Sequence, residues 1–158
     1  MPDIEDFKRE IVRIARCNIG ETAWNFKPSR QAKRNPNVKF GMCEPKCDLF
    51  VYEILLASLI DIGTPHETSN KRFILRLEGK LKRPYTAIDW FNGIVPMFEE
   101  VDQEDVEGGD VVSNGSHVGI VSEYDYTISA TLYDGVVEND FGWRDDENYK
   151  YFSLCQKP

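Results

Sequence analysis

The spacing of apolar residues predicts two helices in the first part of the chain. Over residues 3–17, apolar side chains recur every three or four positions and so share one helical face: Ile4, Phe7, Ile11 and Ile14. Asp3 and Asp6 supply a capping start for this helix. The run from Leu49 to Ile60 is apolar nearly all round and stops near Gly63, which predicts a central helix enclosed by other elements.

The segments around the central helix carry breakers and polar residues. Residues 18–46 are predicted to be loop, because prolines and glycines interrupt them repeatedly. Residues 64–84 are predicted to be a polar connection with a short helix over 73–77. An irregular segment, residues 83–90, precedes an acidic stretch.

The last third of the chain has the composition of β-strands. Strands are predicted over residues 109–112, 117–122, 127–133, 135–141 and 149–155, and Asn114-Gly115 between the first two is a strong hairpin signal. A helix-rich first half followed by an antiparallel sheet predicts an α+β fold. We expect one domain over residues 1–158, because the chain shows no repeat, no low-complexity tract and no second unit.

Charge is unevenly distributed and excludes one class of partner. The net charge of −8 divides into +4 for residues 1–47, zero for 48–96 and −12 for 97–158. This balance argues against nucleic acid, which needs a basic surface. No stretch approaches the length of a membrane span. No signal peptide is visible at the acidic start, so we expect export by a non-classical route, a leader missing from this sequence, or a cytoplasmic protein.

Four cysteines and two histidines limit the possible chemistry. The cysteines are Cys17, Cys43, Cys47 and Cys155; they form no C-x-x-C pair, and the histidines His66 and His117 do not cluster with them. We therefore expect no metal and no organic cofactor. Which of the thiols could form a disulfide stays open.

Cys47 is the candidate nucleophile. It follows Pro45 at the predicted start of the central helix, where unpaired N–H groups and the helix dipole favour a thiolate and could bind an oxyanion. A buried structural cysteine is the alternative. His117 is the candidate base, since it follows the hairpin turn at the mouth of a strand, whereas His66 lies in a polar segment that we expect at the surface.

A third group would orient the imidazole of His117. The following strand offers three acceptors, of which Asp140 is preferred, with Glu138 and Asn139 as alternatives. Glu138 and Asp140 share one strand face and Asn139 points to the other, so the pattern alone does not decide which face meets His117. An exposed acidic strand end is the competing interpretation.

Four short motifs in this order resemble one enzyme family. They are Lys46-Cys47-Asp48-Leu49-Phe50-Val51, Gly109-Asp110-Val111-Val112, His117 to Val121, and the segment from Val137 to Arg144. Together they resemble the NlpC-type and CHAP (cysteine, histidine-dependent amidohydrolase/peptidase) hydrolases, with Lys-Cys-Asp nearest to the branch of secreted amidase effectors. Asp140 stands where the family's Glu-x-Asn pattern has Asn.

The resemblance implies a papain-like fold in which the Cys-bearing helix packs on an antiparallel sheet. It implies cleavage of amide bonds in peptidoglycan or muropeptides, either within stem peptides or between muramic acid and L-alanine, with Cys47 as nucleophile and His117 as base. An inhibitory protein is a possible partner. Trp90 is a candidate for a substrate groove, with core packing as its alternative. Two other functions stay open: a catalytically inactive recognition module of the same fold, and a hydrolase of lipid or protein thioesters or amides.

Overall fold

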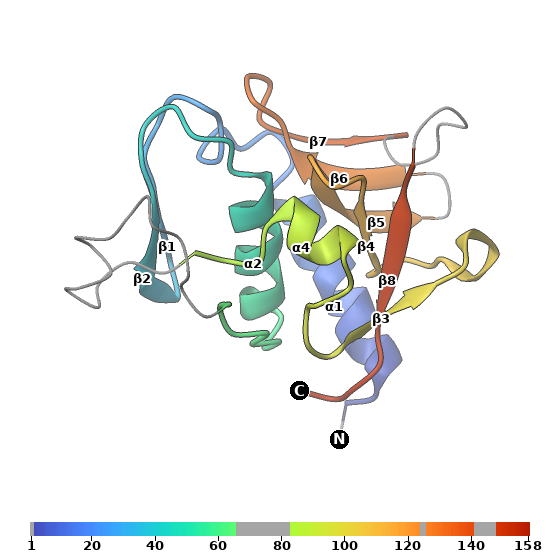
Figure 1. The fold of residues 1–158 in the computed structure, drawn as a ribbon. Coiled ribbons are helices and arrows are strands. Elements are labelled where there is room, and N and C mark those ends of the chain that lie inside the picture. The colour runs from blue at the N-terminus through green and yellow to red at the C-terminus, as the bar shows by residue number, and fades with distance from the viewer. Residues whose placement is uncertain (1, 66–82, 124–125, 141–147) are drawn as a thin grey trace.

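The computed structural model describes residues 2–65, 83–123, 126–140 and 148–158. The predicted short helix over 73–77 and His66 lie outside these ranges. The described elements form an α+β fold in which helices pack on an antiparallel sheet (Figure 1). Among the described helices, none combines the length and apolarity needed to cross a membrane.

The first helix, α1 (Ile4–Cys17), begins where the sequence predicts. Asp3 and Asp6 form a reciprocal capping box, in which each carboxylate accepts a hydrogen bond from the other residue's backbone N–H. Lys8 then joins α1 to the sheet, because its buried ammonium pairs with Glu107 and with Asp110 at 3.2 Å. This helix packs on the central helix and on β5.

The central helix, α2 (Cys47–Ala57), is buried along most of its length, as its apolar run predicts. It ends three residues earlier than the run does, because Leu59 takes a left-handed conformation with φ 65°. The N–H of Ile60 then donates to Leu55 O at 2.9 Å and that of Leu59 to Leu56 O at 3.1 Å, the hydrogen bonds of a Schellman cap. The helix packs on β5 and β6.

Strands and a helix occur where the sequence predicts irregular structure. A hairpin of β1 (Arg30–Ala32) and β2 (Asn35–Phe40) lies within the predicted loop 18–46. The irregular segment contains α4 (Ala87–Phe91), which starts with a capping box between Thr86 and Asp89. The acidic stretch contains β3 (Phe98–Val101) and a 3₁₀ turn, η2 (Gln103–Asp105).

The main sheet has six strands in the order β3-β8-β4-β5-β6-β7, and every neighbouring pair is antiparallel. The strands not yet given are β4 (Val111–Ser113), β5 (Val118–Glu123), β6 (Tyr126–Ala130), β7 (Val136–Asn139) and β8 (Lys150–Leu154). The predicted hairpin is confirmed, since Ser113 of β4 pairs with Val118 of β5. One core joins the helices to the sheet, and a smaller cluster of Val106, Val112, Val121 and Tyr151 packs separately.

Candidate active site

Cys47 is the first residue of α2, and its side chain opens into a pocket. Figure 1 shows this end of α2 at the top of the molecule, near the turn between β6 and β7. The pocket has a volume of ≈ 190 Å³ and is lined by Pro45, Lys46, Cys47, Ser116, His117, Ala130 and Leu132. We call it the Cys47 pocket. It brings together the predicted nucleophile and the predicted base.

A turn fixes the backbone on which His117 stands. The side-chain oxygen of Asn114 accepts from the N–H groups of Ser116 at 3.0 Å and His117 at 2.8 Å, while the backbone N–H of Asn114 donates to His117 O. Gly115 has φ 91°, a conformation that favours glycine. The Ser113 hydroxyl accepts from the Gly115 N–H and donates to Ala87 O at 2.6 Å, which ties the turn to α4.

Lys46 holds the other wall of the pocket. Its ammonium is buried, with the residue only 1% exposed, and donates to three backbone carbonyls: Asn25, Phe26 and Glu44. Burial lowers the pKa of this ammonium. Because its three N–H groups are engaged, Lys46 joins the segment around residue 25 to the start of α2. Sequence analysis did not find this role, since nothing in the pattern indicates which carbonyls a lysine will reach.

The thiol of Cys47 is neutral in this environment, which corrects the expectation of a thiolate. The residue is 9% exposed, and burial raises the pKa of the thiol to about 12, with the Asp48 carboxylate adding to the shift. Backbone N–H groups of Val118, Asp48 and Cys47 act in the opposite direction and lower this pKa. Their contribution is smaller because desolvation of a buried anion outweighs the dipoles of a helix end.

His117 is also neutral. Burial lowers the pKa of its imidazole to about 4. The N–H of Val118, the residue after His117, faces the sulfur of Cys47 closely enough to lower the thiol pKa. The start of β5 therefore lies against the nucleophile. A neutral imidazole beside a neutral thiol can accept the thiol proton when the sulfur attacks.

The three candidates for the orienting group lie away from this pocket. Asn139 pairs with Thr127, and Thr127 pairs with Val121, which is four residues along β5 from His117. Four residues of strand span about 13 Å. Glu138 is directed to Arg16 on α1, with Oε2 3.2 Å from Nη2, and Asp140 follows the distant end of β7.

Figure 1 shows β7 running away from α2, which agrees with this register. The expectation that Asp140, Glu138 or Asn139 orients His117 is therefore corrected. The end of β7 nearest to the site is Val136, which pairs with Ala130, and the three candidates lie farther along the chain. The described residues that line the Cys47 pocket include no carboxylate. The sequence pattern could place these residues on β7 but could not give the direction of β7 relative to His117.

Trp90 belongs to the core rather than to a substrate groove. It is 1% exposed, and its ring packs edge-on against Phe98 with centroids 5.0 Å apart and against Phe152 at 6.1 Å. This position confirms the core-packing alternative. Leu132, which is 44% exposed on the rim of the Cys47 pocket, is available to a substrate instead.

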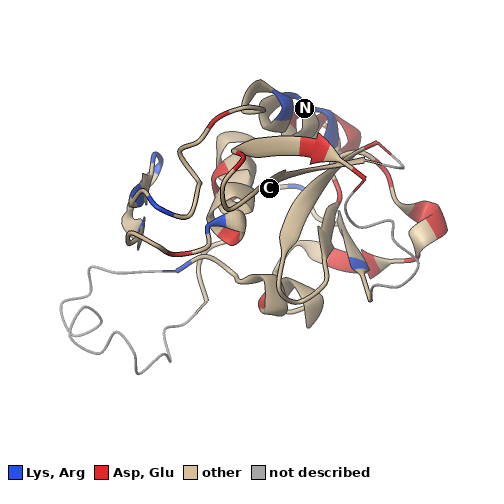
Figure 2. Cartoon of the chain, turned by 90° about the horizontal axis from the view of Figure 1, so that it is seen from above, with Lys and Arg blue, Asp and Glu red and all other residues tan. Residues whose placement is uncertain are grey.

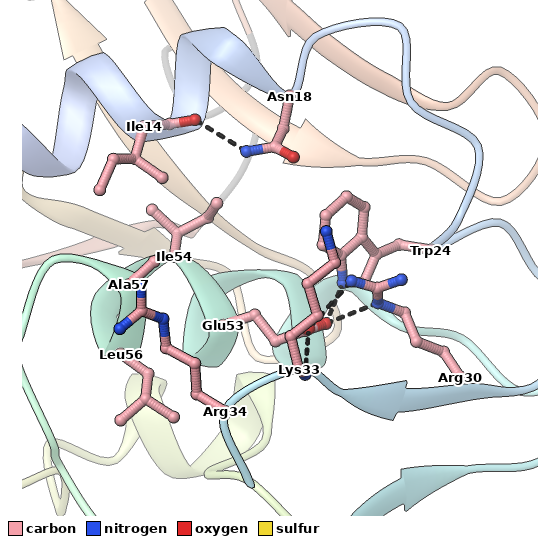
Figure 3. A pocket seen from close by; sticks show the side chains of 10 residues that line it. All are labelled: Ile14, Asn18, Trp24, Arg30, Lys33, Arg34, Glu53, Ile54, Leu56 and Ala57. Atoms are coloured by element: carbon pink, nitrogen blue, oxygen red, sulfur yellow. Dashed lines mark hydrogen bonds and ion pairs between the residues drawn. The ribbon is translucent and has the colours of Figure 1, made fainter. Parts of the chain in front are cut away.

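A second pocket, of ≈ 180 Å³, lies between α2 and the β1–β2 hairpin (Figure 3). Its buried carboxylate, Glu53, accepts from Trp24 Nε1 at 2.6 Å, from Arg30 at 2.7 and 2.9 Å and from the Lys33 N–H at 3.1 Å. The Arg30 guanidinium also lies 4.1 Å from the Trp24 ring centroid. With these bonds Glu53 anchors the hairpin to α2, and the network has a structural role.

The four cysteines are free thiols. Within the described ranges, no group of three or more His, Cys, Asp or Glu side chains is placed to hold a metal ion. Comparison with known proteins finds no match to any family model, any curated protein or any solved structure.

Proposed function

We propose that this chain is a papain-like cysteine amidohydrolase or peptidase that cleaves amide bonds of peptidoglycan, with Cys47 and His117 as a catalytic dyad. The observation that supports the proposal is that both side chains line one pocket at the N-terminal end of a buried helix. The substrate class comes from the sequence resemblance alone. The proposed dyad needs no metal and no organic cofactor.

In the proposed reaction, His117 removes the thiol proton as Cys47 Sγ attacks the carbonyl carbon of the scissile amide. The resulting oxyanion faces the backbone N–H groups of Cys47 and Asp48, which have no partner within the helix. His117 then transfers the proton to the amide nitrogen and the C–N bond breaks. The amine departs, and the acyl group remains on Cys47 as a thioester. Water, deprotonated by His117, then attacks the thioester carbonyl. The C–S bond breaks, the carboxylic acid leaves, and the proton returns from His117 to the sulfur of Cys47.

The neutral resting states of both groups suit this sequence of steps. At neutral pH a thiol with a pKa of about 12 keeps its proton and an imidazole with a pKa of about 4 is unprotonated, which are the starting states of a general-base mechanism. Proton transfer occurs only when substrate is in place, where the developing oxyanion offsets the cost of moving charge. The imidazole remains unprotonated between turnovers.

Digestion of purified peptidoglycan tests the proposal. Mass spectrometry of the released muropeptides should show new amine and carboxyl ends with the parent chain, and none with Cys47→Ala or His117→Ala. Cys17→Ala, which removes an exposed thiol from α1, is the matched control and should retain full activity. Digestion by Cys47→Ala at the parent rate would reject the mechanism, and binding to peptidoglycan without cleavage by the parent would identify a recognition module.

A further inference from the structure

The Cys47 pocket shares one lining side chain with a second pocket. Leu132, in the turn between β6 and β7, lines both the Cys47 pocket and an adjoining pocket of ≈ 290 Å³. The adjoining pocket, which we call the Lys27 pocket, is lined by Thr22, Asn25, Lys27, Pro28, Leu132 and Tyr133. A substrate bound at Cys47 would meet this surface next.

The walls of the Lys27 pocket are held by the same contacts that build the active site. The Asn25 side chain donates to Tyr133 O at 3.3 Å and accepts from the Gly135 N–H at 2.9 Å, so it fixes the β6–β7 turn. The buried ammonium of Lys46 binds the carbonyls of Asn25 and Phe26. The Phe26 and Tyr133 rings meet edge-on at 6.3 Å, although Tyr133 is 69% exposed.

Among the described residues that line the Lys27 pocket, Lys27 is the only charged one. Between residues 22 and 43 the chain carries Lys or Arg at positions 27, 30, 33, 34 and 39 and no Asp or Glu. Figure 2 shows the basic segments on the β1–β2 hairpin at one side and acidic segments around η2 at the other. Among the described residues, no acidic side chain pairs with Lys27, whereas Arg30 is neutralised by Glu53.

We propose that the Lys27 pocket is the substrate subsite next to the scissile bond, and that Lys27 selects a peptide residue bearing a free carboxylate. This inference rests on the proposed function. An ammonium beside an exposed aromatic ring and a leucine fits a short peptide that presents a carboxylate and an aliphatic stem. Lys27 is assigned as a specificity residue that contacts the substrate away from the reacting atoms.

A pair of peptides that differ only in charge tests the assignment. The probes are L-alanyl-γ-D-glutamyl-L-lysine, with a free α-carboxylate on its glutamate, and the same peptide with an α-carboxamide. For the parent we expect kcat/KM about tenfold higher with the carboxylate peptide, expressed mainly in KM. Lys27→Gln should remove this preference by lowering kcat/KM for the carboxylate peptide, and Lys27→Arg should keep the preference.

Lys39→Gln is the matched control, because it removes one charge from the same basic segment at an exposed position of β2 that lies outside both pockets. It should keep the preference for the carboxylate. A preference that survives in Lys27→Gln, or one that Lys39→Gln removes equally, would overturn the assignment while leaving the dyad intact.

A binding measurement on an inactive variant tests the proposed subsite independently of the proposed catalytic activity. Calorimetric titration of both peptides into Cys47→Ala measures the carboxylate preference without turnover. A preference that is lost in Cys47→Ala/Lys27→Gln supports the subsite even if the parent cleaves neither peptide. Equal affinity for the two peptides in Cys47→Ala overturns it, whatever the parent does with peptidoglycan.

Discussion

At the residue scale, three buried groups near the start of α2 hold pKa values displaced toward their neutral forms. Burial raises the pKa of the Cys47 thiol to about 12 and that of the Asp48 carboxyl to about 6, and it lowers the pKa of the His117 imidazole to about 4. In each case desolvation of the charged form is the largest cause. At neutral pH the thiol of Cys47 and the imidazole of His117 therefore carry no charge before substrate arrives.

The imidazole of His117 should make the folded state sensitive to acid. Its pKa is about 4 when folded and about 6.5 when unfolded, so between these values the unfolded chain binds one more proton and stability rises with pH. Lowering the pH from about 7 to about 4 should cost on the order of 3 kcal/mol through this group. Urea unfolding of the parent and of His117→Gln across this range measures the difference.

Asp48 acts with the opposite sign over nearly the same range, because its folded pKa is raised from 3.8 to about 6. The comparison must therefore be made between parent and His117→Gln, in which the Asp48 contribution cancels. Equal acid sensitivity in the two chains would contradict a buried neutral imidazole. Asp48→Asn should shift the parent curve in the reverse direction, with a relative gain in stability above pH 6.

Asp140 should contribute little to catalysis. The strand register carries this residue beyond the distant end of β7, so Asp140→Ala should keep kcat/KM within about twofold of the parent, whereas His117→Ala should lose at least about a hundredfold. Steady-state rates on a soluble stem peptide measure both. A loss for Asp140→Ala comparable to that for His117→Ala would show that the third group does come from β7.

At the element scale, the turn between β4 and β5 determines where His117 stands. Replacing Asn114 with alanine removes the acceptor for the N–H groups of Ser116 and His117. We expect a loss of about 1 kcal/mol in stability and about a tenfold fall in kcat with little change in KM, because the base is displaced while the binding walls remain.

Asn37→Ala is the control for this prediction, since Asn37 is exposed on β2 and far from the turn along the chain. It should leave both kcat and stability unchanged. If Asn114→Ala loses stability but keeps kcat, the turn supports the fold and does not position the base.

The elements that the sequence predicts are those whose pattern is local. The capping box at Asp3, the apolar run of α2 and the Asn114-Gly115 hairpin each encode their structure within a few residues, and all three are confirmed. The hairpin of β1 and β2 was missed, because Pro36 and the polar residues around it suggest loop. Its contacts with Glu53 and with the core come from residues distant in sequence.

For the site residues too, local features follow from the sequence and features that depend on packing do not. The positions of Cys47 and His117 at the ends of their elements follow from the sequence, and the structure places both in one pocket. The environment does not follow, because burial of the sulfur and the direction of β7 depend on how α2 and the whole sheet pack. For this reason the thiolate and the third residue were predicted wrongly.

At the scale of the whole molecule, charge is separated across the protein. Residues 22–43 carry five Lys or Arg and no Asp or Glu, and Lys27 among them lines the pocket next to the site, whereas residues 97–158 carry −12 of the net charge. A carboxylate group would be attracted by the basic segment and repelled by the acidic one. Raising ionic strength from about 0.01 M to about 0.15 M shortens the Debye length from about 30 Å to about 8 Å.

The carboxylate peptide is net neutral, so salt acts on it through the contact between Lys27 and its glutamate carboxylate. We therefore expect its kcat/KM to fall over this range of salt, with kcat nearly constant. The carboxamide peptide, which carries one negative charge fewer, should show a weaker dependence in the same assay. Equal salt dependence for the two peptides would indicate that the positive segment does not guide the substrate.

The central claim is that the sulfur of Cys47 becomes acylated by an amide substrate. Acid quenching of the chain during turnover of a stem peptide, followed by proteolysis and mass spectrometry, measures it directly. We expect the mass of the acyl portion on the peptide containing Cys47, released by hydroxylamine, and no such mass on Cys17, Cys43 or Cys155. Turnover without any adduct on Cys47, undiminished in Cys47→Ala, would contradict the account.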